Sequence, residues 1–250
     1  SQGRYAFALE EVKTRFLLSD KALNQALYRL KIKKRITQIR KSFYAILSPE
    51  YSKQGMIPAS LFIDDMMKSL GRRYYVGLIS AAALHGAAHQ QPMEYFVVVE
   101  KPALRDIKNK KVKINFYVKK KWQEEDIIQI KTDAGNINVS SPELTGMDLL
   151  YYQESTGINR TYTILQELAA EMKVSNLIKT AREYPQTAAI QRLGYLLDCE
   201  LHEQKLATAL LKILNERKFF PVRLAANKNK EGEMDNKWKV IKNIMPESDL

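Results

Sequence analysis

The sequence has a single cysteine, three histidines and no long apolar run, and each shortage excludes a class of protein. Cys199 cannot form an intramolecular disulfide, and its place in the apolar stretch LGYLLDCEL predicts a buried or half-buried thiol without a chemical role. No apolar run approaches the ~18 residues that would span a bilayer, and the start SQGRYAF has no signal-peptide core. We therefore expect a cytoplasmic protein with no membrane partner.

Motifs for metal, cofactor and nucleophile chemistry are missing as well. His85 and His89 are four residues apart, but Gly86 and the following HQQP predict that the helix ends between them. Neither histidine has a carboxylate or thiol neighbour, so we expect no metal site. The chain has no G-x-S-x-G elbow and no glycine-rich phosphate loop. We expect no cofactor and no enzymatic activity.

A metal-dependent nuclease is the enzymatic alternative that stays open. Such an enzyme needs paired carboxylates that hold Mg²⁺ close to a lysine. The nearest candidates are Glu94, Asp126 and Lys131. However, Gln129 occupies the position two residues before the lysine, where an acidic ligand is expected. This makes a divergent nuclease the weakest interpretation of the sequence.

Positive charge, in contrast, is plentiful and unevenly placed. The chain holds 40 Lys and Arg against 28 Asp and Glu, a net charge of +12, and its pI is near 9.5. Residues 1–50 carry 11 basic and 4 acidic side chains, a net of +7, and residues 101–121 carry 9 against 1, a net of +8. This balance favours an anionic partner, either nucleic acid or an acidic protein.

The stretch 19–34 predicts an amphipathic helix with a polar, basic face. Ser19 can serve as its N-cap. Four apolar side chains at three-and-four spacing share one stripe: Leu23, Ala26, Leu27 and Leu30. Five side chains that can hydrogen-bond face the other way and are the candidate DNA contacts of this helix: Lys21, Asn24, Gln25, Tyr28 and Arg29.

Two short strands with a basic tip follow this helix. Residues 36–39 and 43–47 have strand composition, and Arg40 and Lys41 lie between them. A helix followed by a basic hairpin is typical of a winged helix-turn-helix, in which the helix enters a DNA groove and the wing contacts phosphates. The alternative is a solvated amphipathic helix packed on a small sheet.

The sequence predicts fewer helices than a winged helix-turn-helix needs to pack behind its DNA-contacting helix. Residues 10–16 predict a short helix with Val12 and Phe16 facing inward. A DNA-binding winged helix packs three helices, whereas only two are predicted ahead of the hairpin. Either a further helix lies ahead of residue 1, or the later helix 59–70 covers the same apolar surface.

The stretch 48–58, SPEYSKQGMIP, has the composition of a linker. We therefore expect a winged helix-turn-helix domain over residues 1–50 and an α+β interaction domain over residues 59–250. In the second domain, helices at 59–70 and 76–86 precede strands at 95–99, 112–118, 127–132 and 137–140, which predict a small mixed or antiparallel sheet.

Helices dominate the rest of the chain. They are predicted at 142–153, 162–172, 174–183, 187–200 and 203–217, followed by strands at 219–224 and 238–244 around a polar loop at 227–236. Ser140 and Glu143 have the spacing of a capping box for the first of these helices. The expected fold class is α+β, with a winged helix-turn-helix, a small mixed or antiparallel sheet and a C-terminal helical bundle.

A second cluster of positive charge, the basic patch, falls largely in the connection between the strands 95–99 and 112–118. It comprises Lys101, Arg105, Lys108, Lys110, Lys111 and Lys113. An acidic protein partner is the occupant that this patch would suit if the chain acted without DNA.

Several stretches, in a fixed order, carry a family resemblance. They are the predicted winged helix, YYVGLISAAALHGAAHQQP, YFVVVE, INVSSPELTGMDLLYY and QRLGYLLD, over about residues 5–220. Together they resemble the AbiEi antitoxins of abortive-infection, type IV toxin–antitoxin systems. The resemblance implies a winged helix that binds operator DNA and represses its own operon, and a C-terminal domain that counteracts a nucleotidyltransferase-like toxin.

The resemblance also bears on individual residues. It places DNA contacts on the five helix residues given above and on Arg40 and Lys41 of the wing, and it assigns no catalytic residue. The SSPELTGMDLL and RLGYLL stretches are interpreted as structural, with Gly194 permitting a close helix approach. The leading interpretation is thus a non-enzymatic DNA-binding antitoxin. The alternatives are an interaction protein that needs no DNA and the divergent nuclease.

Overall fold

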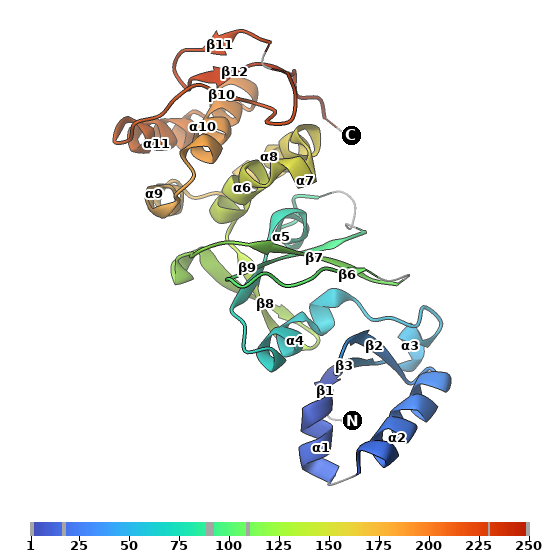
Figure 1. The fold of residues 1–250 in the computed structure, drawn as a ribbon. Coiled ribbons are helices and arrows are strands. Elements are labelled where there is room, and N and C mark those ends of the chain that lie inside the picture. Colours follow the sequence, from blue (N-terminus) through green and yellow to red (C-terminus); the bar gives the residue numbers. More distant parts are fainter. Residues whose placement is uncertain (1–2, 17–18, 89–92, 109–110, 230, 249–250) are drawn as a thin grey trace. The chain divides into compact units, whose positions relative to one another are not determined.

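A computed structural model describes residues 3–16, 19–88, 93–108, 111–229 and 231–248 (Figure 1). Its chain separates into two compact units. The first unit comprises Ser1–Tyr75, Met93–Lys120 and Gln129–Asn138, and the second comprises Val76–Pro92, Lys121–Ile128 and Val139–Leu250. Both units combine helices with strands, which confirms the expected α+β class.

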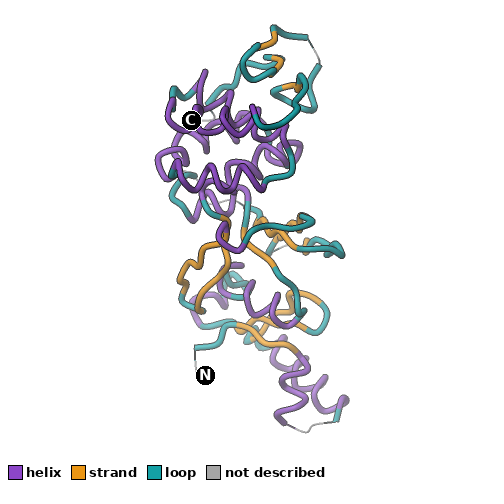
Figure 2. Tube along the Cα trace, turned by 90° about the vertical axis from the view of Figure 1, so that its left-hand side faces the viewer, coloured by secondary structure: helices purple, strands orange, loops and turns teal. Residues whose placement is uncertain are grey.

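The first unit begins with a small three-stranded sheet and two helices. Its elements are β1 (Ala6–Ala8), α1 (Leu9–Phe16), α2 (Asp20–Ile32), β2 (Ile36–Arg40) and β3 (Phe43–Ile46). The strand order is β1-β3-β2 with antiparallel pairing throughout, and the helices lie side by side (Figures 1 and 2). The predicted helix and hairpin are therefore confirmed as secondary structure.

Local chemistry explains where α2 begins and which face it buries. Ser19 is extended, and its hydroxyl accepts a hydrogen bond from the Ala22 amide at 3.3 Å, as an N-cap does. Leu23 and Leu27 are 3% and 5% exposed. They form a cluster whose other members are Ile36, Tyr44, Phe7, Leu9 and Val12. The side of α2 opposite this cluster is left to solvent.

The structure corrects two expectations about the packing of these helices. Phe16 is exposed rather than inward-facing, because only the first half of α1, with Leu9 and Val12, packs on the cluster. Leu30, at the edge of the predicted stripe, is 40% exposed. The helix α1 and the strand β1 thus supply the support for Leu23 and Leu27.

The segment after β3 is more ordered than its linker composition indicated. It contains the short helix α3 (Pro49–Ser52), and Met56 and Ile57 are buried. The predicted helix 59–70 is divided into a 3₁₀ turn at Ala59–Leu61 and α4 (Ile63–Ser69). The division falls at Phe62, whose φ of −137° is not helical. Helix α4 packs against β1.

A six-stranded sheet has the order β6-β7-β5-β4-β9-β8. Its strands are β4 (Tyr74–Val76), β5 (Tyr95–Val99), β6 (Ile107–Lys108), β7 (Lys113–Val118), β8 (Ile127–Thr132) and β9 (Gly135–Ser140). The β5–β7 and β4–β9 pairs are parallel, while β6–β7 is antiparallel. The sheet is therefore mixed, which is one of the two predicted forms. The predicted strands are confirmed, but β4 and β6 were not predicted.

The second unit is mainly helical and holds a small terminal sheet. Its helices are α5 (Leu78–Leu84), α6 (Pro142–Tyr151), α7 (Gln153–Thr156), α8 (Ile158–Glu171), α9 (Val174–Glu183), α10 (Thr187–Tyr195) and α11 (Gln204–Asn215), with a π-helical turn at Leu196–Glu200. The strands β10 (Val222–Arg223) and β12 (Val240–Ile241) are much shorter than predicted, and β11 (Met234–Asp235) lies where a polar loop was predicted.

The predicted capping box of α6 is wrong by one residue. Pro142 occupies the first helical turn, so Ser141 directly before it is the N-cap and accepts a hydrogen bond from the Leu144 amide at 3.2 Å. Ser140 instead shares a 2.6 Å hydrogen bond with the Thr145 hydroxyl. Glu143 accepts a hydrogen bond from the Lys173 amide at 2.8 Å. These polar side chains therefore tie α6 to its surroundings rather than closing a capping box.

Gly194 of α10 permits a close approach, but by the side chain of Trp238 in a turn and not by a helix as predicted. A Cβ atom on this residue would lie 1.9 Å from Cζ3 of the buried Trp238. Cys199, on the π-helical turn, is exposed, so its predicted burial is wrong. A π-helical turn holds an extra residue, which moves the following side chains around the helix axis and away from the apolar face.

Candidate nucleic-acid interface

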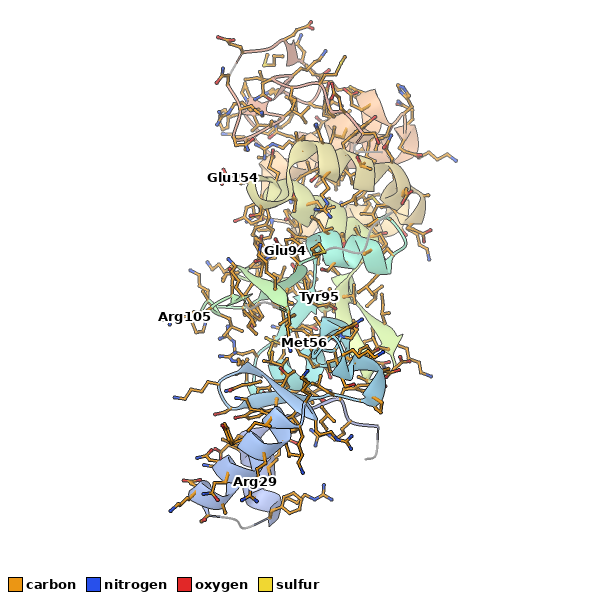
Figure 3. The ribbon with its side chains drawn as sticks, turned by 90° about the vertical axis from the view of Figure 1, so that its right-hand side faces the viewer. Arg29, Met56, Glu94, Tyr95, Arg105 and Glu154 are labelled. Atoms are coloured by element: carbon orange, nitrogen blue, oxygen red, sulfur yellow. The ribbon has the colours of Figure 1, made fainter. Side chains whose placement is uncertain are left out.

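The five predicted DNA-contacting residues of α2 lie on the surface opposite the apolar cluster. All are exposed: Lys21, Asn24, Gln25, Tyr28 and Arg29. Figure 3 labels Arg29 on this helix. Within the described ranges, none of the five side chains has a hydrogen bond or an ion pair. Their donors and acceptors are consequently available to a ligand.

The predicted wing residues lie in the hairpin β2–β3, whose first strand contacts α2. Lys41 is exposed at the tip and Arg40 is half-buried at the end of β2. Ser42 has a φ of +62°, in the left-handed region, which lets the chain turn back into β3. Lys31 Nζ of α2 donates a hydrogen bond to Gln38 Oε1 of β2 at 3.3 Å. This contact joins the end of α2 to the wing.

Ile32 extends this surface and was not among the predicted residues. It lies four positions after Tyr28 and its side chain is 62% exposed. Residues four apart lie on the same face of a helix, so the spacing alone could have identified it. We use the name reading surface for the group formed by Lys21, Asn24, Gln25, Tyr28, Arg29 and Ile32 of α2 with Arg40 and Lys41 of the wing.

The two units differ strongly in charge. The residues of the first unit include 24 Lys and Arg and 10 Asp and Glu, a net of +14. Those of the second unit include 16 and 18, a net of −2. The two values add up to the +12 of the whole chain. An anionic ligand would therefore be attracted to the unit that carries the reading surface.

The basic patch is also in the first unit, but several of its side chains already have partners. Lys113 of β7 forms an ion pair with Glu94, and Lys108 pairs with Asp106 at 3.0 Å. The hydrogen bond from Lys113 holds the pKa of the Glu94 carboxyl below its usual range. The positive charges of Lys108 and Lys113 are thus neutralised by carboxylates within the fold.

The other patch residues differ in their surroundings. Lys111 Nζ donates a hydrogen bond to the carbonyl oxygen of Gly55 at 3.1 Å. Lys101 and Arg105 are exposed on the connection between β5 and β6, where Figure 3 labels Arg105. Their side chains have no partner in the described part of the chain. Lys110 lies outside the described residues.

In the described ranges, no group of three or more histidine, cysteine, aspartate or glutamate side chains could hold a metal ion. His85 Nε2 is 2.8 Å from the carbonyl oxygen of Ser140, and His89 lies outside the described residues. Asp126, a candidate nuclease ligand, is buried and accepts a hydrogen bond from the Thr180 hydroxyl at 2.5 Å.

No helix within the described ranges is long and apolar enough to cross a membrane.

Comparisons with known structures show a shared fold. The crystal structure of the RV2827C protein from Mycobacterium tuberculosis is similar with a TM-score of 0.69 at 16% identity, over 95% of this chain and 86% of that one. The crystal structure of an antigenic nucleotidyltransferase-like protein from Paracoccidioides brasiliensis reaches a TM-score of only 0.33 at 11% identity, over 62% of this chain and 85% of that one.

Comparisons of sequence identify the family. No curated protein sequence matches the chain significantly. The model of the AbiEi antitoxin C-terminal domain matches residues 75–199, which is half of the 250-residue chain. This match includes the SSPELTGMDLL and QRLGYLLD stretches and confirms the resemblance that they carried. The chain therefore belongs to the AbiEi antitoxin family.

Proposed function

We propose that this chain is a non-enzymatic, DNA-binding transcriptional regulator that represses its own operon and counteracts a nucleotidyltransferase-like toxin. Residues 1–50 are assigned the DNA-binding role and residues 59–250 the antitoxin role. One observation is the main support for the DNA-binding role. The helix α2 presents five exposed side chains with hydrogen-bonding groups, and the described part of the chain satisfies none of them.

The arrangement of elements supports a winged helix-turn-helix. From β1 to β3 the order is strand, helix, helix, strand, strand, with the sheet order β1-β3-β2. This is the order of a winged helix from its first strand onward. Leu23 and Leu27 anchor α2 by one side, which fixes the opposite side as the one offered to a ligand. In this class of fold the second helix reads the major groove.

Charge supports the same role for the wing. Arg40 and Lys41 extend the basic surface beyond α2, within a unit of net charge +14. Lysine and arginine contacts to phosphates supply sequence-independent affinity, while contacts to base edges supply specificity. We assign phosphate contacts to Arg40 and Lys41 and base contacts to residues of α2.

A gel-shift experiment with the full chain and the DNA upstream of its own gene tests the repressor role. We expect retardation of this duplex at protein concentrations that leave a shuffled duplex of equal length free. The affinity should fall steeply with salt because bound phosphates release counterions. Equal retardation of both duplexes, or none of either, would contradict operator binding.

Membership of the AbiEi family supports the antitoxin role. The matched model, over residues 75–199, describes the C-terminal domain of these antitoxins. Co-expression of the full chain with the product of a neighbouring nucleotidyltransferase-like gene tests this role. Growth should be rescued by the wild-type chain and by a Gln25→Ala/Arg29→Ala variant that no longer binds the operator. Failure of the wild-type chain to rescue growth would contradict it.

A second candidate is that the chain neutralises its toxin by direct contact and needs no DNA. The exposed, unpartnered side chains of Lys101 and Arg105 favour this candidate, because an acidic surface could pair with them. A Lys101→Ala/Arg105→Ala variant should then lose rescue but keep operator binding. Unchanged rescue by this variant would remove the basic patch from the antitoxin role.

A further inference from the structure

Two side chains with large apolar parts, an aromatic ring and a branched aliphatic group, lie on the polar face of α2. Tyr28 and Ile32 are 65% and 62% exposed, whereas Leu23 and Leu27 on the opposite side are 3% and 5% exposed. Tyr28 and Ile32 are four residues apart, so their side chains are neighbours on the helix surface. Single exposed apolar residues are ordinary, but an exposed pair within a hydrogen-bonding face points to a ligand with apolar groups of its own.

The neighbours of this pair have a complementary chemistry. Gln25 lies one turn before Tyr28, and Arg29 lies one turn before Ile32; both are exposed. The seven residue steps from Gln25 to Ile32 advance by ~10.5 Å along the helix, which corresponds to about three base pairs. The face therefore offers an amide, a phenol, a guanidinium and a branched aliphatic group over the length of about three base pairs.

The major groove of DNA that contains A·T pairs has matching groups. Thymine presents a C5-methyl group there, and adenine presents the N7 acceptor and N6 donor that glutamine binds in a bidentate manner. The net charge of +14 on the first unit matches the phosphates that flank these edges. Uracil in RNA has no C5-methyl group, and the major groove of A-form RNA is too narrow for a side chain to read.

We propose that Tyr28 and Ile32 contact the C5-methyl groups of thymines, so that the DNA read by α2 contains A·T pairs opposite the C-terminal half of the helix. This inference rests on the proposed DNA-binding function and adds the bases that are read. Gln25 binds the adenine of such a pair, and Arg29 binds an adjacent guanine.

Uracil substitution tests this proposal with the full chain. In the duplex that the wild-type chain retards, each thymine of the footprint is replaced in turn by deoxyuridine, which removes only the methyl group. We expect the Kd to rise about fourfold for each methyl that α2 contacts. The Ile32→Ala variant should bind the thymine duplex more weakly than the wild type and should not respond to uracil at the position that Ile32 reads.

Matched controls separate base reading from folding and from general apolar contact. Met93 of the same unit is 95% exposed, so Met93→Ala should keep wild-type affinity and wild-type sensitivity to uracil. Because Ile32 is exposed, Ile32→Ala should keep the thermal unfolding midpoint of the wild type.

The possible outcomes distinguish this inference from the function on which it rests. If the wild-type chain retards no specific duplex, operator binding itself is overturned. If it binds specifically but uracil changes nothing, or if Tyr28→Ala and Ile32→Ala stay as sensitive to uracil as the wild type, only the thymine contacts are overturned. Equal affinity for an RNA duplex of the same sequence would also overturn them.

Discussion

The first unit carries two basic surfaces that look alike in the sequence and differ in the fold. On the reading surface, the five predicted residues of α2 have no side-chain partner in the described part of the chain. In the basic patch, Lys108 and Lys113 are paired with Asp106 and Glu94, and Lys111 is bound to a backbone carbonyl. Charge density alone therefore does not show which side chains are free to bind a ligand.

The two surfaces also differ in how they are held. The helix α2 is fixed by Leu23 and Leu27 in an apolar cluster, so its exposed face has a defined orientation. The patch spans the connection between β5 and β6 and the beginning of β7, and its paired lysines contribute to local structure. A ligand of Lys108 or Lys113 would have to displace an existing ion pair, whereas a ligand of α2, or of Lys101 and Arg105, would displace only water.

The largest effect is expected from removing the anchor of the reading surface. Leu27→Ala deletes a side chain that is 5% exposed and should lower the free energy of unfolding by about 2–5 kcal/mol. Chemical denaturation measures this loss, and operator binding should fall with it. The matched variant Leu30→Ala, at a position that is 40% exposed, should cost much less. Equal losses for the two variants would contradict the description of the cluster.

Arg29→Ala tests the reading surface directly. It should weaken operator binding by about 1–3 kcal/mol if the guanidinium reads a guanine edge, with no change in thermal stability. Gel-shift titration at fixed salt measures this change. Arg105→Ala, which removes an equally exposed arginine of the basic patch, is the control and should leave the Kd unchanged. A larger loss for Arg105→Ala would reverse the roles of the two surfaces.

Lys41→Ala tests the wing through salt dependence. A phosphate contact adds about 0.9 to the slope of log K against log salt, so the variant should have a slope lower by about that amount. The affinity should fall by a similar factor for operator and shuffled DNA, because phosphates carry no sequence information. Lys108→Ala should keep the wild-type slope. An unchanged slope for Lys41→Ala would exclude this residue from phosphate contact.

The smallest effect is expected from the ion pair of the basic patch. The pKa of Glu94 is lowered in the folded chain, so its contribution to stability is present above the pKa of the unfolded chain and is lost as the pH falls through the folded value. Lys113→Ala should reduce this contribution, by no more than about 1 kcal/mol because both side chains are partly exposed.

Urea unfolding of both proteins between pH 6 and about pH 3 measures the difference. The wild type should lose more stability than Lys113→Ala over this interval. Parallel curves for the two proteins would show that the pair has no energetic role.

Periodicity and capping chemistry made much of the first unit predictable. The spacing of Leu23 and Leu27 located the buried side of α2, and Ser19 located its start. A composition rich in β-branched and aromatic residues located β5 and β8 at their observed bounds. These features depend on neighbours within a few residues, so a single sequence contains the information that specifies them.

Other features depend on residues that are far apart in the sequence. The pairing of Lys113 with Glu94 joins β7 to the residue directly before the neighbouring strand β5, and only the fold shows that this part of the patch is neutralised. Strand β4 is only three residues long and overlaps the start of the helix predicted at 76–86, so its sequence alone does not mark it as a strand. The exposure of Phe16 and Cys199 similarly follows from packing at helix ends and turns, which periodicity does not determine.

The most direct test of the central claim is a parallel operator titration of three full-length proteins: the wild type, Arg29→Ala and Arg105→Ala. The free side chains of α2 predict that the wild type and Arg105→Ala bind the upstream DNA with the same Kd, while Arg29→Ala binds about 5- to 150-fold more weakly. Equal binding by all three proteins, or a loss confined to Arg105→Ala, would contradict the assignment of DNA recognition to α2.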